Sequence, residues 1–188
     1  SKLNNKVGWT TIPYDQNEFP FEKIIEKNIL EFLNSEHGSI IDRLEDLHLD
    51  KSVMQNLEIV RQKMFSIFRG EEFQYCYKLF AKFLMDNFAD EFALIQKTPT
   101  ARIQPPHFMT TSFHSDAWYG HSKSTNSFWV PITDVTANNT LNMAASRELS
   151  EITMNKLVKG SYSLKEINDI CLDCTEPSIV KKGQILTF

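Results

Sequence analysis

The chain has 188 residues, of which 41% are hydrophobic and 23% are charged, and its formal net charge is −4. This length suits one domain with a sizeable core, and the acidic balance argues against a nucleic-acid partner. The sequence contains no apolar run long enough to cross a bilayer and no apolar signal core at its start, so we expect neither a membrane anchor nor a signal peptide.

The first 90 residues have the periodicity of α-helices. Residues 20–35 place Pro20 in a plausible first turn and repeat apolar side chains at three- and four-residue steps. Residues 52–68 repeat this spacing and precede Gly70, a residue typical of helix ends. Residues 71–88 carry an aromatic stripe, which we interpret as core rather than as a cofactor site.

The later half has short strand-like segments separated by loops that contain proline or asparagine. They read ARIQ (101–104), SFHSD (112–116), NSFWVPITDV (126–135), NTLNM (139–143) and KKGQILTF (181–188). Two helical insertions, residues 146–157 and 163–174, precede the last strand. Helices first and strands later predict a single α+β domain over residues 1–188, with helices of residues 1–90 buttressing a mostly antiparallel sheet or jelly roll built from residues 91–188.

The chain has three cysteines, and two of them, Cys171 and Cys174, form a C-x-x-C pair. Redox and zinc sites use this spacing, but no second C-x-x-C and no nearby histidine accompany it, so we interpret the pair as ordinary thiols. An odd and sparse set of cysteines fits a reducing compartment, and we expect a cytoplasmic protein.

The segment SFHSDAWYGH (112–121) contains the strongest candidate for a site. On a strand, the side chains of His114 and Asp116 project to the same face, with backbones roughly 6.5–7 Å apart. One imidazole nitrogen and one carboxylate oxygen suit a divalent transition metal. A set of two histidines and one carboxylate leaves positions open for a cosubstrate and O₂ at a non-haem Fe(II) centre. A hydrogen-bonded His–Asp pair without metal is the alternative.

The order of motifs in residues 100–188 resembles that of the Fe(II)/2-oxoglutarate-dependent dioxygenases, within them the phytanoyl-CoA-dioxygenase-like branch and its streptomycin-biosynthesis-type members. FHSDAWYGH is followed by NSFWVPITDV, then by NTLNM, and finally by KKGQILTF. The resemblance covers about half of the chain, and the helical half is compatible with it.

The resemblance implies a double-stranded β-helix, also called a jelly roll, that holds iron near one mouth. His114 and Asp116 would be two of three iron ligands, and 2-oxoglutarate would chelate the metal. Reaction with O₂ would yield succinate, CO₂ and a hydroxylated small molecule. Because related halogenases replace the carboxylate by a small residue, Asp116 favours hydroxylation or desaturation.

The sequence departs from the family at its end. The family's second histidine and the arginine that binds 2-oxoglutarate both follow the strand that GQILTF resembles, and this chain contains neither. We expect truncation rather than a degenerate protein, because an unpaired edge strand would promote aggregation.

Other positions have two interpretations each. Asn126 is a candidate for binding 2-oxoglutarate or a metal-bound group, or else it caps a strand end. Arg102 is a candidate for binding an anionic substrate or cosubstrate, or else it pairs with a structural carboxylate. Thr140 is a third candidate for cofactor binding and could face the interior of the barrel. The side chains expected to line the substrate pocket, or merely to pack, are Trp118, Tyr119, His121, Trp129 and Gln104.

Three functions therefore compete. The leading hypothesis is an oxygenase that uses Fe(II), 2-oxoglutarate and O₂ on a small molecule. The second is a cupin-like binding module or an inactive relative. The third is a zinc hydrolase that uses His114, Asp116 and His121.

Overall fold

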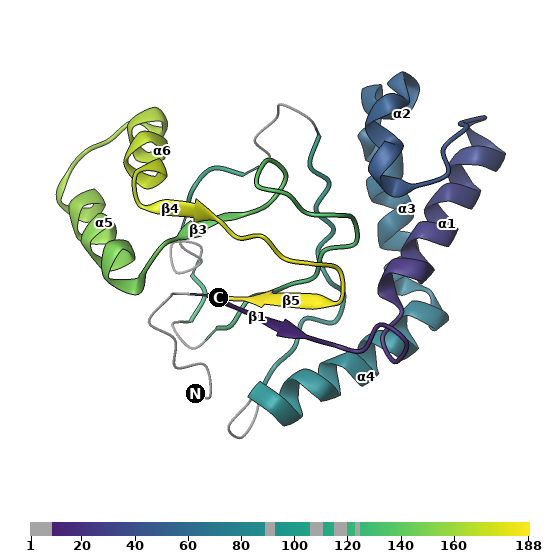
Figure 1. The fold of residues 1–188 in the computed structure, drawn as a ribbon, viewed down its shortest axis with the longest axis horizontal. Coiled ribbons are helices and arrows are strands. Elements are labelled where there is room, and N and C mark those ends of the chain that lie inside the picture. Colours follow the sequence, from purple (N-terminus) through teal and green to yellow (C-terminus); the bar gives the residue numbers. More distant parts are fainter. Residues whose placement is uncertain (1–8, 89–92, 106–110, 115–119, 123–124) are drawn as a thin grey trace. The chain divides into compact units, whose positions relative to one another are not determined.

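The structure is a computed structural model that describes residues 9–88, 93–105, 111–114, 120–122 and 125–188. The described chain divides into two compact units (Figure 1). Unit 1 comprises Tyr14–Phe108 and Ile132–Asp134, and unit 2 comprises Leu3–Pro13, Met109–Pro131 and Val135–Phe188. The expected α+β class is confirmed, because helices make up unit 1, and small antiparallel sheets with two further helices make up unit 2.

Unit 1 consists of helices that form where the apolar periodicity predicts them. Its elements are α1 (Phe21–Glu36), the 3₁₀ helix η1 (Leu44–Leu49), α2 (Lys51–Gln55), α3 (Leu57–Arg69) and α4 (Glu71–Phe88). Pro20 is the N-cap of α1 rather than a first-turn residue. A cap residue needs no helical N–H, so proline is tolerated there.

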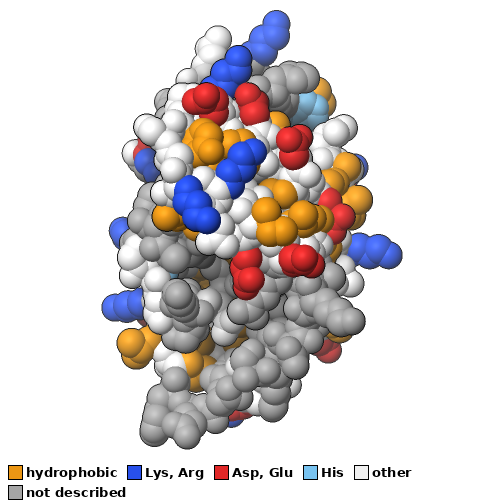
Figure 2. Space-filling model, turned by 90° about the vertical axis from the view of Figure 1, so that its left-hand side faces the viewer, with side chains coloured by type: hydrophobic (Ala, Val, Ile, Leu, Met, Phe, Trp, Pro, Cys, Tyr) orange, Lys and Arg blue, Asp and Glu red, His pale blue; other side chains and the backbone are white. Residues whose placement is uncertain are grey.

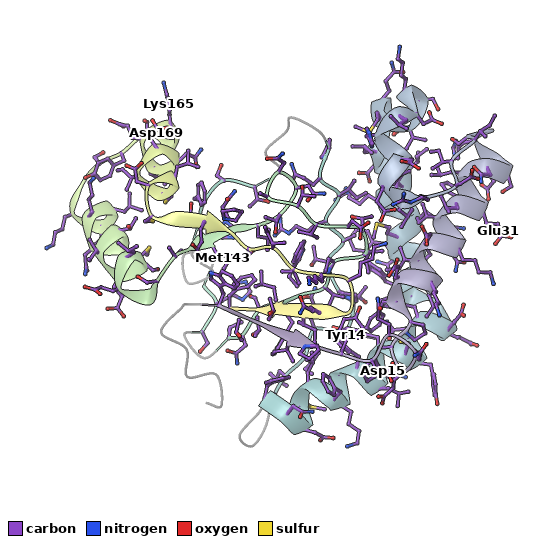
Figure 3. The ribbon with its side chains drawn as sticks, in the orientation of Figure 1. Tyr14, Asp15, Glu31, Met143, Lys165 and Asp169 are labelled. Carbon is purple, nitrogen blue, oxygen red and sulfur yellow. The ribbon has the colours of Figure 1, made fainter. Side chains whose placement is uncertain are left out.

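An aromatic cluster forms the core of unit 1. The phenol ring of Tyr14, which is labelled in Figure 3, lies edge-on to that of Phe80, with ring centroids 5.7 Å apart. The ring centroid of Phe21 lies 4.9 Å from that of Phe80 and 5.5 Å from that of Phe73. Each of these rings is at most 9% exposed. The aromatic stripe of residues 71–88 is therefore core, as its spacing predicted.

The helix expected over residues 52–68 is divided in two. Asp50 caps α2, since its Oδ1 accepts the backbone N–H groups of Ser52 at 2.9 Å and Val53 at 3.1 Å. The backbone then leaves the helical region at Asn56, with φ −137° and ψ 57°, and α3 begins at Leu57. Asparagine accepts such a break because it favours caps and turns over helix interiors.

Unit 2 contains two antiparallel sheets. In the first, β5 (Gln184–Thr187) lies between β1 (Thr10–Pro13) and β2 (Phe128–Trp129). In the second, β3 (Asn142–Ala144) pairs with β4 (Thr175–Pro177). Two helices, α5 (Arg147–Lys159) and α6 (Leu164–Leu172), connect β3 to β4, and both helical insertions that the sequence predicted are thus confirmed.

The last strand, β5, has a partner strand on each side. Ile185 is opposite Ile12 of β1, while Leu186 is opposite both Thr11 of β1 and Trp129 of β2. Ile185 and Leu186 are both fully buried although they point to opposite faces of the sheet. The premise that the last strand would lack a partner does not hold within the described residues, because residues 10–13 supply a partner that periodicity did not reveal.

Two predicted strands are absent from the described residues. Residues 101–105 and 111–114 have no strand pairing, and the strand expected over 126–135 is limited to β2. Pro131 follows β2 closely and lacks the N–H that a ladder requires. Within the described ranges neither sheet closes and no jelly roll is formed.

The helices α5 and α6 carry single exposed apolar residues among charged ones. On the face shown in Figure 2, apolar side chains are interspersed with acidic and basic side chains. Ile152 and Val158 of α5 are 57% and 79% exposed. Scattered apolar residues of this kind are common on protein surfaces and do not by themselves indicate a binding surface. In the described part of the chain, no helix has the length and apolar character needed to span a membrane.

Candidate functional site

His114 lies in an exposed segment of unit 2. One hydrogen bond from the backbone of this segment and one from the His114 imidazole hold it in place. The backbone N–H of Phe113 donates to Oδ1 of Asn168 in α6 at 3.4 Å. The Nδ1 atom of His114 lies 2.8 Å from the carbonyl oxygen of Ser112. Because a carbonyl only accepts, Nδ1 carries a proton, and in the neutral ring the lone pair that a metal needs is then on Nε2. Metal-ligating histidines commonly have their other ring N–H bonded in this way.

Three of the predicted site residues lie outside the described residues. These are Asp116, the second proposed iron ligand, and the aromatic pair Trp118 and Tyr119. Within the described ranges no group of three or more His, Cys, Asp or Glu side chains could hold a metal ion. The ligand assignment therefore stays a prediction.

His121 follows a sharp turn and is exposed. Gly120 has φ +85°, a conformation that side chains with a Cβ rarely adopt, and a Cβ there would meet no atom within 4 Å. The glycine in the Tyr-Gly-His sequence thus serves the backbone turn.

The NSFW segment lies beside the last strand in unit 2. The backbone groups of Ser127 exchange two hydrogen bonds with those of Phe188, at 2.9 and 3.2 Å. Trp129 is half-buried in β2, opposite Leu186, and Asn126 is exposed just before this pairing begins. The structure therefore places the Asn126 side chain at a strand end, where its predicted role toward 2-oxoglutarate stays open to test.

The hydroxyl of Thr140 donates to the carbonyl oxygen of Ser178, 38 residues away. Ser178 in turn donates from its own hydroxyl and from its backbone N–H to the carbonyl oxygen of Leu141, at 2.7 and 2.9 Å. These bonds continue the β3–β4 pairing by one more step. The described contact of Thr140 is structural, and its predicted role in cofactor binding stays a prediction.

Arg102 and Gln104 both belong to unit 1 and are exposed. The side-chain amide of Gln104 donates to the carbonyl oxygen of Pro105 at 3.4 Å. The strand predicted over residues 101–104, which contains both of them, is not formed.

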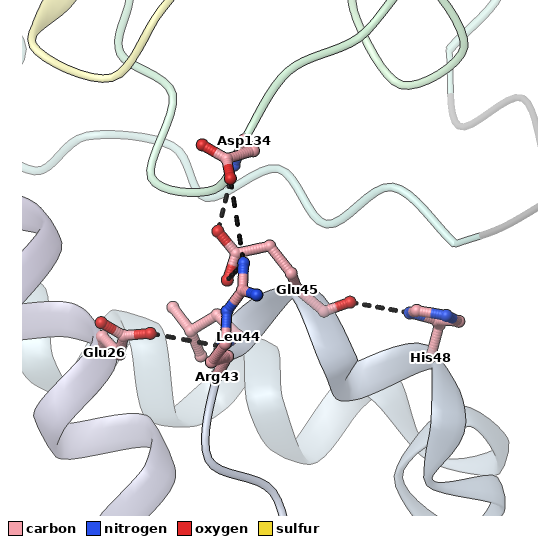
Figure 4. A network of polar contacts seen from close by, with 6 residues as sticks. All are labelled: Glu26, Arg43, Leu44, Glu45, His48 and Asp134. Atoms are coloured by element: carbon pink, nitrogen blue, oxygen red, sulfur yellow. Dashed lines mark hydrogen bonds and ion pairs between the residues drawn. The ribbon is translucent and has the colours of Figure 1, made fainter.

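Asp134, at the end of the NSFWVPITDV segment, takes part in a polar network of unit 1 (Figure 4). Its backbone N–H donates to Oε1 of Glu45 at 3.2 Å, and its carboxylate lies 3.8 Å from the guanidinium of Arg43. Arg43 also lies 3.5 Å from Oε2 of Glu45. The aspartate of this segment therefore orders a loop, and at 66% side-chain exposure it stabilises the fold only slightly.

Two buried polar groups of unit 2 are not among the site residues predicted from the sequence. The hydroxyl of Thr187 in β5 and the indole N–H of Trp9 are both buried, and neither has a hydrogen-bond partner among the described residues. A buried polar group left unpaired costs about 1–3 kcal/mol, so each is a candidate contact for a ligand. For Thr187 the sequence does contain an indication, because this residue is a polar one in the otherwise apolar end of GQILTF.

The C-x-x-C pair has the properties of ordinary thiols. Cys171 and Cys174 are free and buried, and the thiol of Cys174 donates to the carbonyl oxygen of Cys171 at 3.3 Å. Burial, with a smaller contribution from Cys174, raises the pKa of Cys171. A raised pKa lowers the thiolate fraction and with it the reactivity.

Comparison of the chain with protein-family models, with curated proteins and with solved structures finds no match in any of the three.

Proposed function

We propose that this chain is part of an Fe(II)- and 2-oxoglutarate-dependent oxygenase that hydroxylates a small molecule with release of succinate and CO₂. The observation that carries the proposal is the H-x-D motif of His114 and Asp116, followed in order by NSFW, NTL and GQILTF. The absence of a membrane-spanning helix from the described residues and the three free cysteines are compatible with the cytoplasmic location that we propose.

The connectivity of the described strands of unit 2 is compatible with part of the jelly roll that we propose. The chain passes from β2 in one sheet to β3 and β4 in a second sheet, then returns to β5 beside β2. Jelly rolls are built from two sheets between which the chain crosses repeatedly. Both faces of β5 are buried, as expected for a strand inside such a layered fold.

The chemistry of His114 supports a metal site. Its Nδ1–H is committed to the Ser112 carbonyl, which leaves the lone pair on Nε2. Together with the Asp116 carboxylate, this nitrogen fits two positions of the 2-His-1-carboxylate set of non-haem Fe(II) oxygenases. A bound Fe(II) would supply the activation of O₂ that no side chain can provide.

The chain's own residues then have separate tasks. Asn168 holds the backbone before His114 in place, and Ser112 fixes the ring tautomer. Trp129, half-buried in β2, offers an apolar wall, and Asn126 offers an amide at the end of the same segment.

The test is the replacement Asp116→Ala in the full gene product. With Fe(II), ascorbate and 2-oxoglutarate, the unmodified protein should release succinate slowly even without substrate. Asp116→Ala should reduce this release more than about 100-fold, since even residues that only support metal ligands cost 10–100-fold. Succinate is measured by mass spectrometry, and circular dichroism checks that the variant is folded.

Asp134→Ala is the matched control, because it removes a carboxylate whose described contacts are with Arg43 and Glu45. It should retain succinate release. Equal release from the Asp116 variant and the unmodified protein would refute the ligand assignment. Stoichiometric zinc without succinate release would favour the hydrolase instead.

A further inference from the structure

We infer that unit 1 contains a second binding site, independent of the H-x-D motif, that takes the phosphate group of a small phosphorylated molecule carrying a planar ring. The site is an open surface cleft of about 440 Å³ beside the junction between the end of α3 and the start of α4. This volume lies within the usual range of ligand pockets. The cleft is lined by Arg69, Glu71, Gln74, Tyr75, Lys78, Lys97 and Thr98.

The charge of the cleft is opposite to that of the chain. The whole chain carries a net charge of −4, whereas the cleft lining has three cations and one carboxylate. None of Arg69, Lys78 and Lys97 forms an ion pair within the described residues. A concave surface with an excess of one sign of charge attracts and concentrates ions of the opposite sign.

Helix stability explains only part of this charge. Arg69 lies in the last turn of α3, where a cation offsets the helix dipole. Lys78 lies in the interior of α4 and Lys97 lies outside any helix, so the dipole accounts for neither. The acidic residues Glu71 and Glu72 of the first turn of α4 follow the ordinary dipole pattern.

The walls of the cleft are held in place by specific bonds. The side-chain amide of Gln74 donates to the carbonyl oxygen of Phe68 at 2.6 Å and approaches that of Lys97 at 3.5 Å. The hydroxyl of Tyr77 donates to the carbonyl oxygen of Gln96 at 2.8 Å. These bonds attach residues 96–97 to α4, so the cleft exists before a ligand arrives and little ordering entropy is lost on binding.

The lining residues define the ligand. One face of α4 presents Glu71, Gln74, Tyr75 and Lys78 to the cleft, at the i, i+3, i+4 and i+7 positions. Arginine and lysine with nearby hydroxyls are typical phosphate partners. The ring of Tyr75 is 70% exposed and gives a planar group a surface to stack on. A mono- or diphosphate attached to a base or a similar ring therefore matches the cleft better than a bare anion.

The test titrates iron-free protein with three probes at low salt: inorganic pyrophosphate, adenosine diphosphate and adenosine. Calorimetry measures affinity, and two-dimensional NMR locates the perturbed amides. Pyrophosphate should bind and should perturb residues 69–78 and 97–98. Adenosine diphosphate should bind several-fold more tightly than pyrophosphate, and adenosine alone should not bind.

Two pairs of variants separate the parts of the cleft. Lys78→Gln should weaken pyrophosphate about threefold, a typical effect for one exposed charge. Lys82→Gln is its control, because Lys82 lies one turn further along α4 and pairs with Asp86 at 2.6 Å. Tyr75→Ala should remove the advantage of adenosine diphosphate while leaving pyrophosphate affinity unchanged, and Tyr75→Leu should behave in the same way.

Three outcomes would overturn the inference. The first is an absence of measurable pyrophosphate binding at low salt, and the second is an equal loss in the Lys78 and Lys82 variants. The third is perturbation of amides away from the cleft. Because the protein is free of iron and 2-oxoglutarate, each outcome is independent of whether the oxygenase proposal holds.

Discussion

Tyr14 shows how burial of one hydroxyl changes the behaviour of the chain at alkaline pH. The side chain is 9% exposed and packs against the rings of Phe19, Phe21 and Phe80. Burial, with smaller contributions from Glu22 and Cys76, raises the pKa of Tyr14 to about 12. Burial likewise raises the pKa of the Cys76 thiol to about 11, with a contribution from Glu72.

We predict that the free energy of unfolding falls as the pH rises from about 9 to 12. A raised pKa means that the folded state keeps protons that the unfolded chain loses, so stability is full below the unfolded-state pKa and decreases above it. Two pKa units for Tyr14 correspond to about 2–3 kcal/mol. Urea denaturation between pH 8 and 12 measures this slope.

Tyr14→Phe should flatten the part of the slope above about pH 10, because it removes the ionising group and keeps the ring. Tyr75→Phe is the matched control, since Tyr75 is 70% exposed. Its alkaline slope should equal that of the unmodified chain. A slope that Tyr14→Phe leaves unchanged would show that another group causes the loss of stability.

At the scale of elements, the start of α6 depends on a capping box. The hydroxyl of Ser163 accepts the backbone N–H of Glu166 at 3.3 Å, and the Glu166 carboxylate accepts the backbone N–H of Ser163 at 2.8 Å. The hydroxyl of Ser163 lowers the pKa of Glu166 by donating to its carboxylate. The motif Ser-x-x-Glu before an apolar run is visible in the sequence, and the structure confirms that a helix starts there.

Ser163→Ala should destabilise α6 by about 1 kcal/mol, because the backbone N–H of Glu166 loses its acceptor and the Glu166 carboxylate loses the hydroxyl that donates to it. Hydrogen exchange of the amides of residues 164–172 reports this change directly. Ser161→Ala, two residues earlier and exposed, removes a hydroxyl that takes no part in the cap. The two variants should differ, and equal exchange would mean that the cap contributes nothing to α6.

At the scale of the whole molecule, β5 joins distant parts of the chain. Residues 184–187 pair with residues 10–13 on one side and with residues 128–129 on the other. The sheet of unit 2 therefore depends on contacts between the beginning, the middle and the end of the sequence. Such contacts close long loops and form cooperatively.

We predict that Ile185→Ala lowers the free energy of unfolding of unit 2 by about 2–5 kcal/mol. The side chain is fully buried, so its loss leaves a cavity in the central strand. Ile179→Ala is the control, since Ile179 is 55% exposed and should cost less than about 0.5 kcal/mol. Hydrogen exchange should show the loss of protection in β1 and β2 as well as in β5, and protection lost in β5 alone would contradict a cooperative sheet.

The sequence alone determined the class of the fold and the longer helices, but not η1 or the break between α2 and α3. The apolar spacing of α1, α3, α4, α5 and α6 was sufficient, because helix periodicity is a local property of consecutive residues. The H-x-D motif and the tasks proposed for His114 and Asp116 also came from the sequence.

The tertiary structure decided which strands exist and which residues share a sheet. Residues 101–105 look like a strand in the sequence but have no partner, whereas Thr10–Pro13 form one because β5 pairs with them. A strand is stabilised by hydrogen bonds to another part of the chain, so its own pattern is not sufficient to predict it. The cleft beside Tyr75 likewise needed the three-dimensional structure, because residues 69–78 and 97–98 meet only once α4 and the segment after it are folded.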